Sequence, residues 1–362
     1  MKRIAIIGAG NAGCMTALAT YYQFSKRRID SEILIYHNPK EHPIELVGQG
    51  TLPLPTQLIS NILDIDWYNN EIGATLKTGI LYEGWGKKKE KFFHPFSLEL
   101  IAIHFVPEKL SQAVLNFKDF TVIEKTIKDP DKEIDADMIF DCRGKNNRNE
   151  KEYNDLINPL NSVLISRKNK IDKDLIYTRA VATPNGWTFV IPNEDSISYG
   201  YLYNKNITST KEATADFLER FNLSKIDKEI KFKNYMVKDI FKGERTILQG
   251  NKCGFLEPLE ANSIPFYIDV CLYSLDLLFN PKNNKDLVNK KVQKEMKKIE
   301  TFILWHYQFG SKYNSPFWEY AKSLPFKPDK EFLKILERKI LNANYNQWEG
   351  YAFKNWLDGV NL

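Results

Sequence analysis

The sequence predicts an α/β protein in which a Rossmann-type dinucleotide-binding domain is combined with an antiparallel sheet and a helical C-terminal region. Three observations predict this fold. An apolar run at 4–7 leads directly into a glycine-rich turn at 8–13. Apolar runs on both sides of a Pro-Asn-Gly turn signal indicate antiparallel strands within 177–203. Two long helical segments are expected at 264–280 and 285–309, and 362 residues with 43% hydrophobic content can bury a sizeable core.

The glycine-rich turn lies between an expected buried strand at 4–7 and an expected helix at 14–22, and a second strand is expected at 33–36. In this setting the first glycine allows a tight turn and the second lets the backbone approach a pyrophosphate. The third lets the helix pack close to the strand. The N–H groups at the start of the helix would bind the phosphates. The expected dinucleotide contacts are Gly8, Gly10, Asn11, Ala12 and Gly13.

The end of the second strand departs from the usual dinucleotide site. Tyr36, His37 and Asn38 stand where an acidic residue would bind a ribose hydroxyl. A histidine or asparagine can still bond a hydroxyl, so a dinucleotide remains the expected ligand. The turn alone leaves NAD and FAD as alternatives.

We expect residues 1–280 to form the cofactor-binding core, with a substrate-side sheet at about 160–235, and residues 281–362 to form a helical region packed on it. The lysines of 285–298 are expected on the solvent-exposed face of an amphipathic helix, because the apolar residues Val288, Val292 and Met296 recur every four residues. The net charge of +5 is then mostly solvated surface, and no nucleic-acid partner is expected.

The cysteines and the N-terminus indicate a cytoplasmic protein. The spacing of the four cysteines fits neither a metal site nor a disulfide framework. The first apolar run is interrupted too early for a signal peptide, and no segment is long or apolar enough to span a bilayer. We therefore expect no metal and no membrane partner.

Two distant segments carry residues suited to chemistry. Lys77 lies among small and apolar residues in 74–81, where loss of water would favour the neutral, nucleophilic amine. The structural alternative is a surface lysine on a strand edge. Glu257 and Glu260 precede an apolar helix, for which Asn262 or Ser263 is the expected N-cap. Glu257, next to a proline, is expected to cap or pair.

These segments, together with Trp187-Thr188-Phe189-Val190-Ile191-Pro192, resemble the flavin-dependent halogenases of the tryptophan halogenase family. The resemblance is collinear from Ile4 to about Trp318 and implies a flavin monooxygenase-like fold. It implies that Lys77 delivers the halogen and that Glu260 positions the halogenating species and accepts the substrate proton. The halide would bind backbone amides at Asn262 and Ser263. The family reads Ser-Thr-Gly where this chain has Ala261-Asn262-Ser263, so the halide is chloride or bromide, with a preference for the larger bromide or iodide as an alternative.

The resemblance also implies FAD as the cofactor. Segments 48–53, 137–144 and 250–254 resemble the second glycine-rich loop, the closing strand of the FAD domain and the loop that reaches the flavin. A second nucleotide fingerprint is missing from the sequence, so reduced FAD is expected from a separate flavin reductase. The further cofactor residues implied are Gly48, Gln49, Gly50, Thr51, Trp187, Gly250, Phe255, Leu256 and Ile264.

On the substrate side, the resemblance assigns a small, electron-rich aromatic compound, such as an indole or a phenol, to a pocket walled by His94, Phe96 and Phe189. The segments 303–307 and 315–318 match a helical substrate region and are expected to serve packing. The expected activity is FAD-dependent halogenation, in which reduced FAD, oxygen and halide give hypohalous acid. A monooxygenase that uses no halide and a catalytically silent flavin-binding relative are the alternatives. The oligomeric state stays open, with a homodimer as one option.

Overall fold

The computed structural model describes residues 1–41, 47–65, 70–87, 89–96, 100–144, 150–169, 175–338, 344–345 and 348–360. The predicted dinucleotide-binding part is built on a six-stranded sheet with the order β17-β18-β9-β1-β2-β8. All neighbours are parallel except β17 and β18. The bounds are β1 Lys2–Ile7, β2 Ser31–His37, β8 Phe120–Glu124, β9 Met138–Asp141, β17 Phe241–Lys242 and β18 Thr246–Leu248. This confirms the predicted Rossmann-type arrangement.

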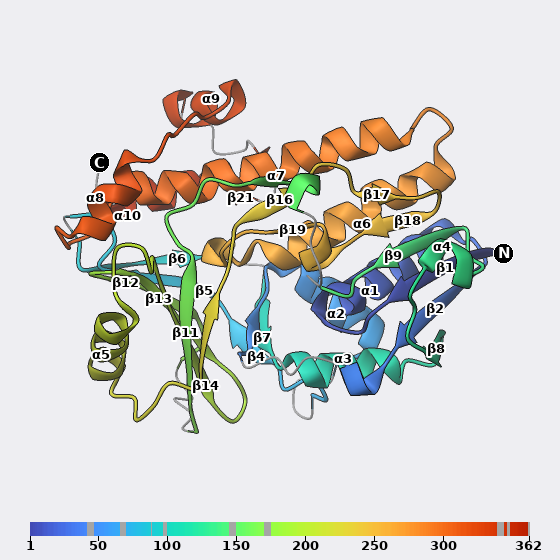
Figure 1. Cartoon of the computed structure of the whole chain (residues 1–362), viewed down its shortest axis with the longest axis horizontal. Coiled ribbons are helices and arrows are strands. Elements are labelled where there is room, and N and C mark those ends of the chain that lie inside the picture. The colour runs from blue at the N-terminus through green and yellow to red at the C-terminus, as the bar shows by residue number, and fades with distance from the viewer. Residues whose placement is uncertain are drawn as a thin grey trace.

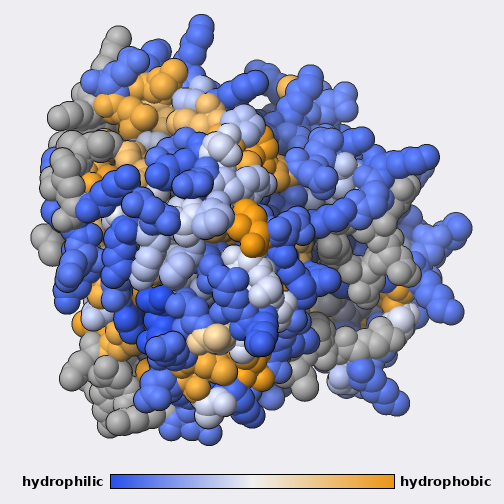
Figure 2. Space-filling view, turned by 60° about the vertical axis from the view of Figure 1, so that its left-hand side comes forward, coloured by the Kyte–Doolittle hydropathy of each residue, from blue (hydrophilic) through white to orange (hydrophobic). Residues whose placement is uncertain are grey.

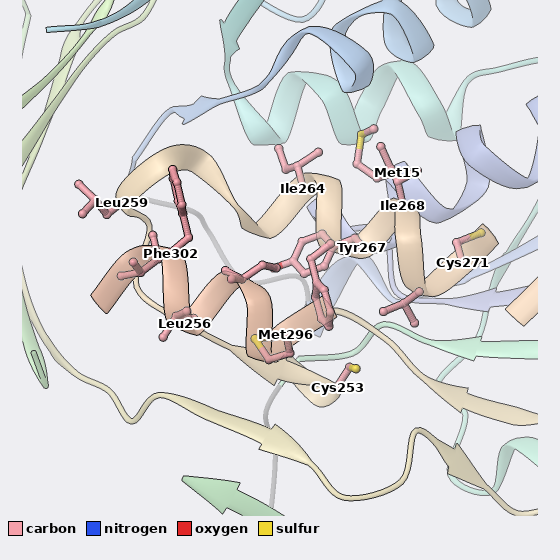
Figure 3. Packing of buried hydrophobic residues seen from close by; sticks show 14 of the residues in the cluster. Met15, Cys253, Leu256, Leu259, Ile264, Tyr267, Ile268, Cys271, Met296 and Phe302 are labelled. Atoms are coloured by element: carbon pink, nitrogen blue, oxygen red, sulfur yellow. The ribbon is translucent and has the colours of Figure 1, made fainter. Parts of the chain in front are cut away.

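Several helices pack around this sheet. Helix α1 connects β1 to β2 and packs against α6, while α2 and α3 lie next to α1 (Figure 1). In Figure 3, Ile264 and Ile268 of α6 lie near Met15 of α1, and Met296 of α7 lies below Tyr267. The bounds are α1 Asn11–Arg27, α2 Pro53–Leu63, α3 Pro107–Leu115, α6 Ser263–Phe279 and α7 Lys285–Gln308. Both long helices predicted for this part of the chain are confirmed.

The sheet predicted on the substrate side has seven strands in the order β15-β11-β14-β13-β12-β5-β6. It extends beyond the predicted range of about 160–235, because β5 and β6 come from an earlier part of the chain. Its neighbours are antiparallel except β12 and β5, which are parallel. Helix α5 covers one face, where Phe217 and Phe221 pack against Tyr199 and Tyr201. The bounds are β5 Gly79–Glu83, β6 Lys91–Pro95, β11 Ser162–Lys168, β12 Thr178–Thr183, β13 Gly186–Pro192, β14 Ile197–Tyr203, β15 Lys228–Lys231 and α5 Thr210–Phe221.

Short elements connect these two sheets. Two three-stranded sheets have the orders β3-β7-β4 and β10-β16-β19, and β20 pairs with β21. The first of them carries Lys77 at the end of β4. The bounds are β3 Gln49–Gly50, β4 Thr75–Lys77, β7 Ala102–Phe105, α4 Pro130–Glu133, β10 Tyr153–Asp155, β16 Tyr235–Val237, β19 Gly254–Phe255, β20 Asn344–Tyr345 and β21 Trp348–Glu349. Single 3₁₀ turns occur at Pro39–Glu41, Glu150–Glu152, Gly250–Lys252 and Leu259–Ala261.

The C-terminal region is helical and shares the main hydrophobic core with the rest of the chain. Helix α7 runs along one side of the molecule from the dinucleotide-binding part to the substrate-side sheet (Figure 1). Val288, Val292 and Met296 are buried as predicted, and the same core extends to Val360. The remaining helices are α8 Pro316–Ser323, α9 Lys330–Arg338 and α10 Gly350–Val360.

The outer surface is largely polar on the face seen in Figure 2, where hydrophobic residues occur in several separate areas. Within the described ranges, every helix is too short or too polar to cross a membrane.

Candidate active site

A cavity of about 1250 Å³ extends from the glycine-rich turn to the substrate-side sheet. Lys77 and Glu260, which are 183 positions apart in the sequence (260 − 77), both line it. The predicted cofactor residues that line it are Gly8, Gly10, Asn11, Ala12, Gly48, Gln49, Gly50, Trp187, Phe255 and Ile264. The structure therefore brings most of the predicted cofactor residues and both predicted catalytic side chains to one cavity.

Four predicted cofactor residues do not line the cavity: Gly13, Thr51, Gly250 and Leu256. Gly250 has a φ of +62°, and a Cβ atom there would lie 2.5 Å from the Cβ of Ala12. It thus allows the loop to approach the start of α1. The side chain of Leu256 packs in the core below α6 and α7 (Figure 3). Direct contact of these residues with a cofactor stays a prediction.

The glycine-rich turn fits a bound pyrophosphate. Gly8 has a φ of +102°, and a Cβ atom at Gly13 would lie 1.9 Å from the Gly8 carbonyl oxygen. A Cβ atom at Gly10 would meet nothing within 4 Å, because this position faces open space. Helix α1 begins after Gly10 with no side-chain cap and no acidic residue in its first turn, so its N-terminal dipole can attract an anion.

Replacing Gly13 by alanine should therefore destabilise the protein by about 1–3 kcal/mol, because the added Cβ atom meets rigid backbone. The matched control for folding is Gly10→Ala, whose Cβ atom has space and whose backbone is extended. Urea unfolding measures both. A Gly13→Ala protein as stable as the Gly10→Ala protein would contradict the close packing of α1 on β1.

Basic side chains surround the same cavity. Arg143 and Lys252 both pair with the buried Asp141, and further lysines complete the lining. Asn38, at the expected ribose position, donates a hydrogen bond to Thr126 Oγ1 over 2.6 Å and accepts one from the Lys40 N–H. The additional cavity lysines are Lys125, Lys128, Lys231 and Lys233. This charge suits an anionic cofactor.

Lys77 is buried rather than exposed on a strand edge. Only 1% of the residue is accessible, and its amine donates a 2.8 Å hydrogen bond to the carbonyl oxygen of Thr51. The amine also lies 5.3 Å from the centre of the Phe96 ring. Burial lowers the pKa of Lys77 from 10.5 to about 7, although the Glu260 carboxylate opposes this shift. A substantial fraction of the amine is thus neutral near pH 7.

Hydrogen bonds join the strand that carries Lys77, and its neighbour β7, to the seven-stranded sheet. Thr75 Oγ1 donates to the carbonyl oxygen of Pro192 over 2.9 Å, which links β4 to the end of β13. His104 Nε2 lies 2.8 Å from Thr178 Oγ1. Burial, and next the charge of Lys77, hold the pKa of His104 well below its usual value. Sequence reasoning missed His104, which no local pattern distinguishes from a core residue.

Burial of Lys77 has a consequence for stability. Its pKa in the folded protein is below the unfolded value of 10.5, so the penalty for the buried ammonium is fully present below about pH 7. Between about pH 7 and 10.5 the unfolded chain holds the extra proton and stability rises with pH.

Lys77→Met should therefore stabilise the protein at pH 6, by an amount on the order of a few kcal/mol, and much less at pH 10. The exposed Lys87 gives the control, Lys87→Met. Urea unfolding at both pH values measures this, and an equal effect of Lys77→Met at both would contradict a buried ammonium.

Glu260 lies in the 3₁₀ turn before α6 with left-handed backbone geometry, φ +71°. Its Oε1 accepts a hydrogen bond from the Tyr82 hydroxyl and lies 3.0 Å from Nε2 of His306. Its Oε2 accepts one from the indole N–H of Trp348 over 3.3 Å. Burial by itself would raise the pKa of Glu260, but His306, His94 and Tyr82 outweigh it and lower the pKa from 4.5 to about 2.

Glu257 holds the turn that presents Glu260. It is buried, accepts a 2.6 Å hydrogen bond from the Tyr307 hydroxyl, and accepts the N–H of Leu259 over 2.9 Å. Burial raises the pKa of Glu257 to about 7. Its carbonyl oxygen, like that of Leu259, accepts the side-chain amide of Asn262 over 2.9 Å. Glu257 therefore has a structural role, as expected for a glutamate next to a proline that caps or pairs.

The start of α6 differs in one detail from the prediction. Asn262 occupies the N-cap position, but its side chain makes no capping hydrogen bond because it is engaged with the preceding turn. Ser263 is the first helical residue and lines the cavity, whereas Asn262 does not line it. The first turn of α6 contains no acidic residue. An uncapped helix start thus faces the cavity, as a halide site requires.

The two aromatic residues of the 187–192 motif lie on one face of β13, as predicted. Trp187 and Phe189 both line the cavity, with ring centres 6.2 Å apart. Gly200 on the neighbouring strand makes room for Phe189, since a Cβ atom there would lie 2.0 Å from the ring. Gly200 has no signal in the sequence, because strand pairing alone brings it beside Phe189.

His94 and Phe96 are not among the residues that line the cavity. His94, on β6, is buried with its ring 6.5 Å from Tyr82 and 5.9 Å from Tyr351. Its buried Nδ1 atom has no hydrogen-bond partner in the part of the chain that the structure describes. Burial lowers the pKa of His94. Their roles as substrate contacts stay predictions.

The chain is similar to known halogenases over most of its length. The family model for tryptophan halogenases matches residues 3–109 and 103–359. Tryptophan 7-halogenase RebH from Lentzea aerocolonigenes is 26% identical over 207 residues, which is 52% of this chain and 39% of that protein. The 7-chloro-L-tryptophan 6-halogenase KtzR from Kutzneria sp. is 24% identical over 304 residues, 76% of this chain and 57% of that protein. The chain thus matches about two to three fifths of the length of these relatives.

Solved structures share the fold. BrvH, a flavin-dependent halogenase from Brevundimonas sp. BAL3, superposes with a TM-score of 0.78 over 100% of this chain and 90% of that chain, at 18% identity. Xcc4156, a flavin-dependent halogenase from Xanthomonas campestris, gives a TM-score of 0.79 over 99% of this chain and 89% of that chain, also at 18% identity.

Proposed function

The chain belongs to the tryptophan halogenase family, and from this premise we propose that it is an FAD-dependent halogenase that acts on a small, electron-rich aromatic compound. The observation that carries the proposal is the presence of Lys77 and Glu260 in the same cavity as the glycine-rich turn. Lys77 has the buried, partly neutral amine and Glu260 the ionised carboxylate that the chemistry needs. Reduced FAD with oxygen and halide would supply hypohalous acid.

The residues that would hold FAD are those of the glycine-rich turn, the loop 48–50 and the start of α6. Gly10 leaves open space for the pyrophosphate, and the lysines and Arg143 around the cavity suit its charge. Trp187 and Phe189 would separate the isoalloxazine ring from the bound substrate. Such a wall would stop direct oxygen transfer to the substrate.

The halide would bind at the start of α6. Ser263 lines the cavity, and the side chain of the N-cap residue Asn262 makes no capping hydrogen bond to this helix. The partial positive charge of the helix N-terminus stabilises an anion. Because Asn262 holds the preceding turn through its side chain, the backbone there would be fixed before the halide arrives.

Lys77 would direct the electrophilic halogen to the substrate. Its amine is anchored at the Thr51 carbonyl oxygen, next to the flavin loop, and its burial excludes water that would otherwise disperse the oxidant. The substrate ring would lie between Lys77 and Glu260, with Glu260 as acceptor of the ring proton.

The test is a halogenation assay with purified protein. FAD would be kept reduced by a separate flavin reductase, and bromide or chloride would be offered with a panel of indoles and phenols under air. We expect products whose mass shows a halogen in place of a hydrogen, and only when halide is present. Products that gain oxygen without halide would indicate a monooxygenase. Tight FAD binding without any product would indicate a catalytically silent relative.

A further inference from the structure

We infer that His306 and Glu260 hold one proton between them, and that His306 is the positioning residue that keeps Glu260 a carboxylate until the substrate gives up its proton. This inference rests on the proposed function. It concerns a histidine on α7 that comes from a segment expected to serve only packing.

The hydrogen-bond geometry fixes the proton count. His306 Nδ1 lies 2.7 Å from the carbonyl oxygen of Phe302, which can only accept, so Nδ1 carries a proton. His306 Nε2 lies 3.0 Å from Oε1 of Glu260. An unprotonated Nε2 would place its lone pair against the carboxylate oxygen and the two atoms would repel each other. A proton therefore also lies between Nε2 and Oε1. The pair is therefore imidazolium with carboxylate, or imidazole with carboxylic acid.

The other partners of Glu260 favour the ionised form. The Tyr82 hydroxyl donates to Oε1 and the Trp348 indole N–H donates to Oε2. Hydrogen bonds donated to a carboxylate stabilise its charged form. The shared proton then lies on His306, and a buried ion pair replaces a buried lone carboxylate.

Titratable groups on four neighbouring elements face this pair. They are Lys77 on β4, Tyr82 on β5, His94 on β6 and Glu257 in the loop before α6. Burial lowers the pKa of both Lys77 and His94, so these two groups give up positive charge readily near neutral pH. His306 is then the cation in direct hydrogen-bond contact with Glu260.

The pair is held rigidly. His306 is fully buried, and its ring packs 4.1 Å from Trp356 and 4.8 Å from Phe302 between ring centres. The next residue on α7, Tyr307, holds Glu257. The consecutive residues His306 and Tyr307 of α7 therefore hold both glutamates of the loop. In the turn between them and α6, Glu260 and Ala261 both have positive φ. Such strained geometry persists only where its surroundings determine it.

The proposed step balances. The ring π electrons attack the halogen of hypohalous acid and form the carbon–halogen bond, while the halogen–oxygen bond breaks and hydroxide leaves. The electrons of the C–H bond then restore the aromatic ring, and its proton passes to Glu260. The hydroxide then takes this proton from Glu260 and forms water, while His306 keeps its own proton, so Glu260 starts the next turnover as a carboxylate.

The first test is the pH profile of His306→Gln and His306→Asn. Glutamine and asparagine cannot carry the positive charge, so Glu260 should protonate at higher pH. We expect kcat to fall by about tenfold or more at neutral pH and the acid limb of the kcat profile to move up by about one unit or more, with KM little changed. Tyr307→Phe is the control: it should lower thermal stability through Glu257 without moving the acid limb. A fall in kcat that is equal at all pH values, with the limb unmoved, would overturn the inference.

The second test needs no turnover and therefore separates this inference from the proposed function. Melting temperatures at pH 7 are measured for His306→Gln, Glu260→Gln and the double variant. We expect each single substitution to lower the melting temperature and the double variant to lose much less than the sum, because either change alone breaks the pair. Additive losses would overturn the inference even if the enzyme halogenates, and coupled losses would support it even if no substrate is found.

Discussion

Lys77→Met is expected to lower the rate of substrate halogenation by an amount on the order of 10³-fold. Methionine has a similar length and fills the same buried position, but it has no nitrogen that can bind or direct the halogen. Oxygen consumption with reduced FAD and halide should continue, because Lys77 is not needed to form hypohalous acid. The rate is measured from the halogenated product by mass spectrometry.

The control for this variant is the exposed Lys87→Met, which should halogenate like the unmodified protein. A halogen trap added to the solution should capture more oxidant from the Lys77→Met protein than from either of the others, since the oxidant is no longer held. Unchanged rate and regioselectivity in the Lys77→Met protein would remove Lys77 from the mechanism.

Glu260→Gln is expected to lower kcat by about 10²–10⁴-fold, because the ring proton loses its acceptor. Removal of this proton should then limit the rate, so a ring deuterated at the reacting position should react more slowly in the variant than its protonated form. The amide keeps the size of the carboxylate, and KM should change much less than kcat.

The exposed Glu244→Gln serves as the matched control and should show neither effect. Thermal melting of the Glu260→Gln protein separates loss of chemistry from loss of fold. A well-folded variant with normal kcat and no isotope effect would show that another group accepts the proton.

Local sequence patterns predict the parts of the fold that depend on backbone freedom and on the spacing of apolar residues. The glycine turn 8–13 and the helices at 264–280 and 285–309 are confirmed, because backbone freedom and apolar spacing leave few alternatives there. The parallel pairing of β5 with β12 was not predicted, since it joins segments that are about a hundred residues apart and have no pattern in common.

The sequence predicts the two charged residues of the candidate site, but not the residues that surround them. The resemblance pointed to Lys77 and Glu260, and apolar neighbours in the sequence indicated that Lys77 could be desolvated. The partners of Glu260 come from β5, α7 and β21, so only the folded chain brings Tyr82, His306 and Trp348 together. His306 lies in a segment that resembled a packing helix, and its spacing gave no sign of a role beside Glu260.

The most direct test of the central claim, that one cavity joins the flavin to Lys77 and Glu260, is a crystal structure of the protein with FAD and bromide. We predict the isoalloxazine ring next to Trp187, an anomalous bromide peak near the backbone of Ser263, and the Lys77 amine and Glu260 carboxylate on the same cavity beyond them. Density that places the flavin outside this cavity, or the Lys77 amine in bulk solvent away from Glu260, would contradict the account.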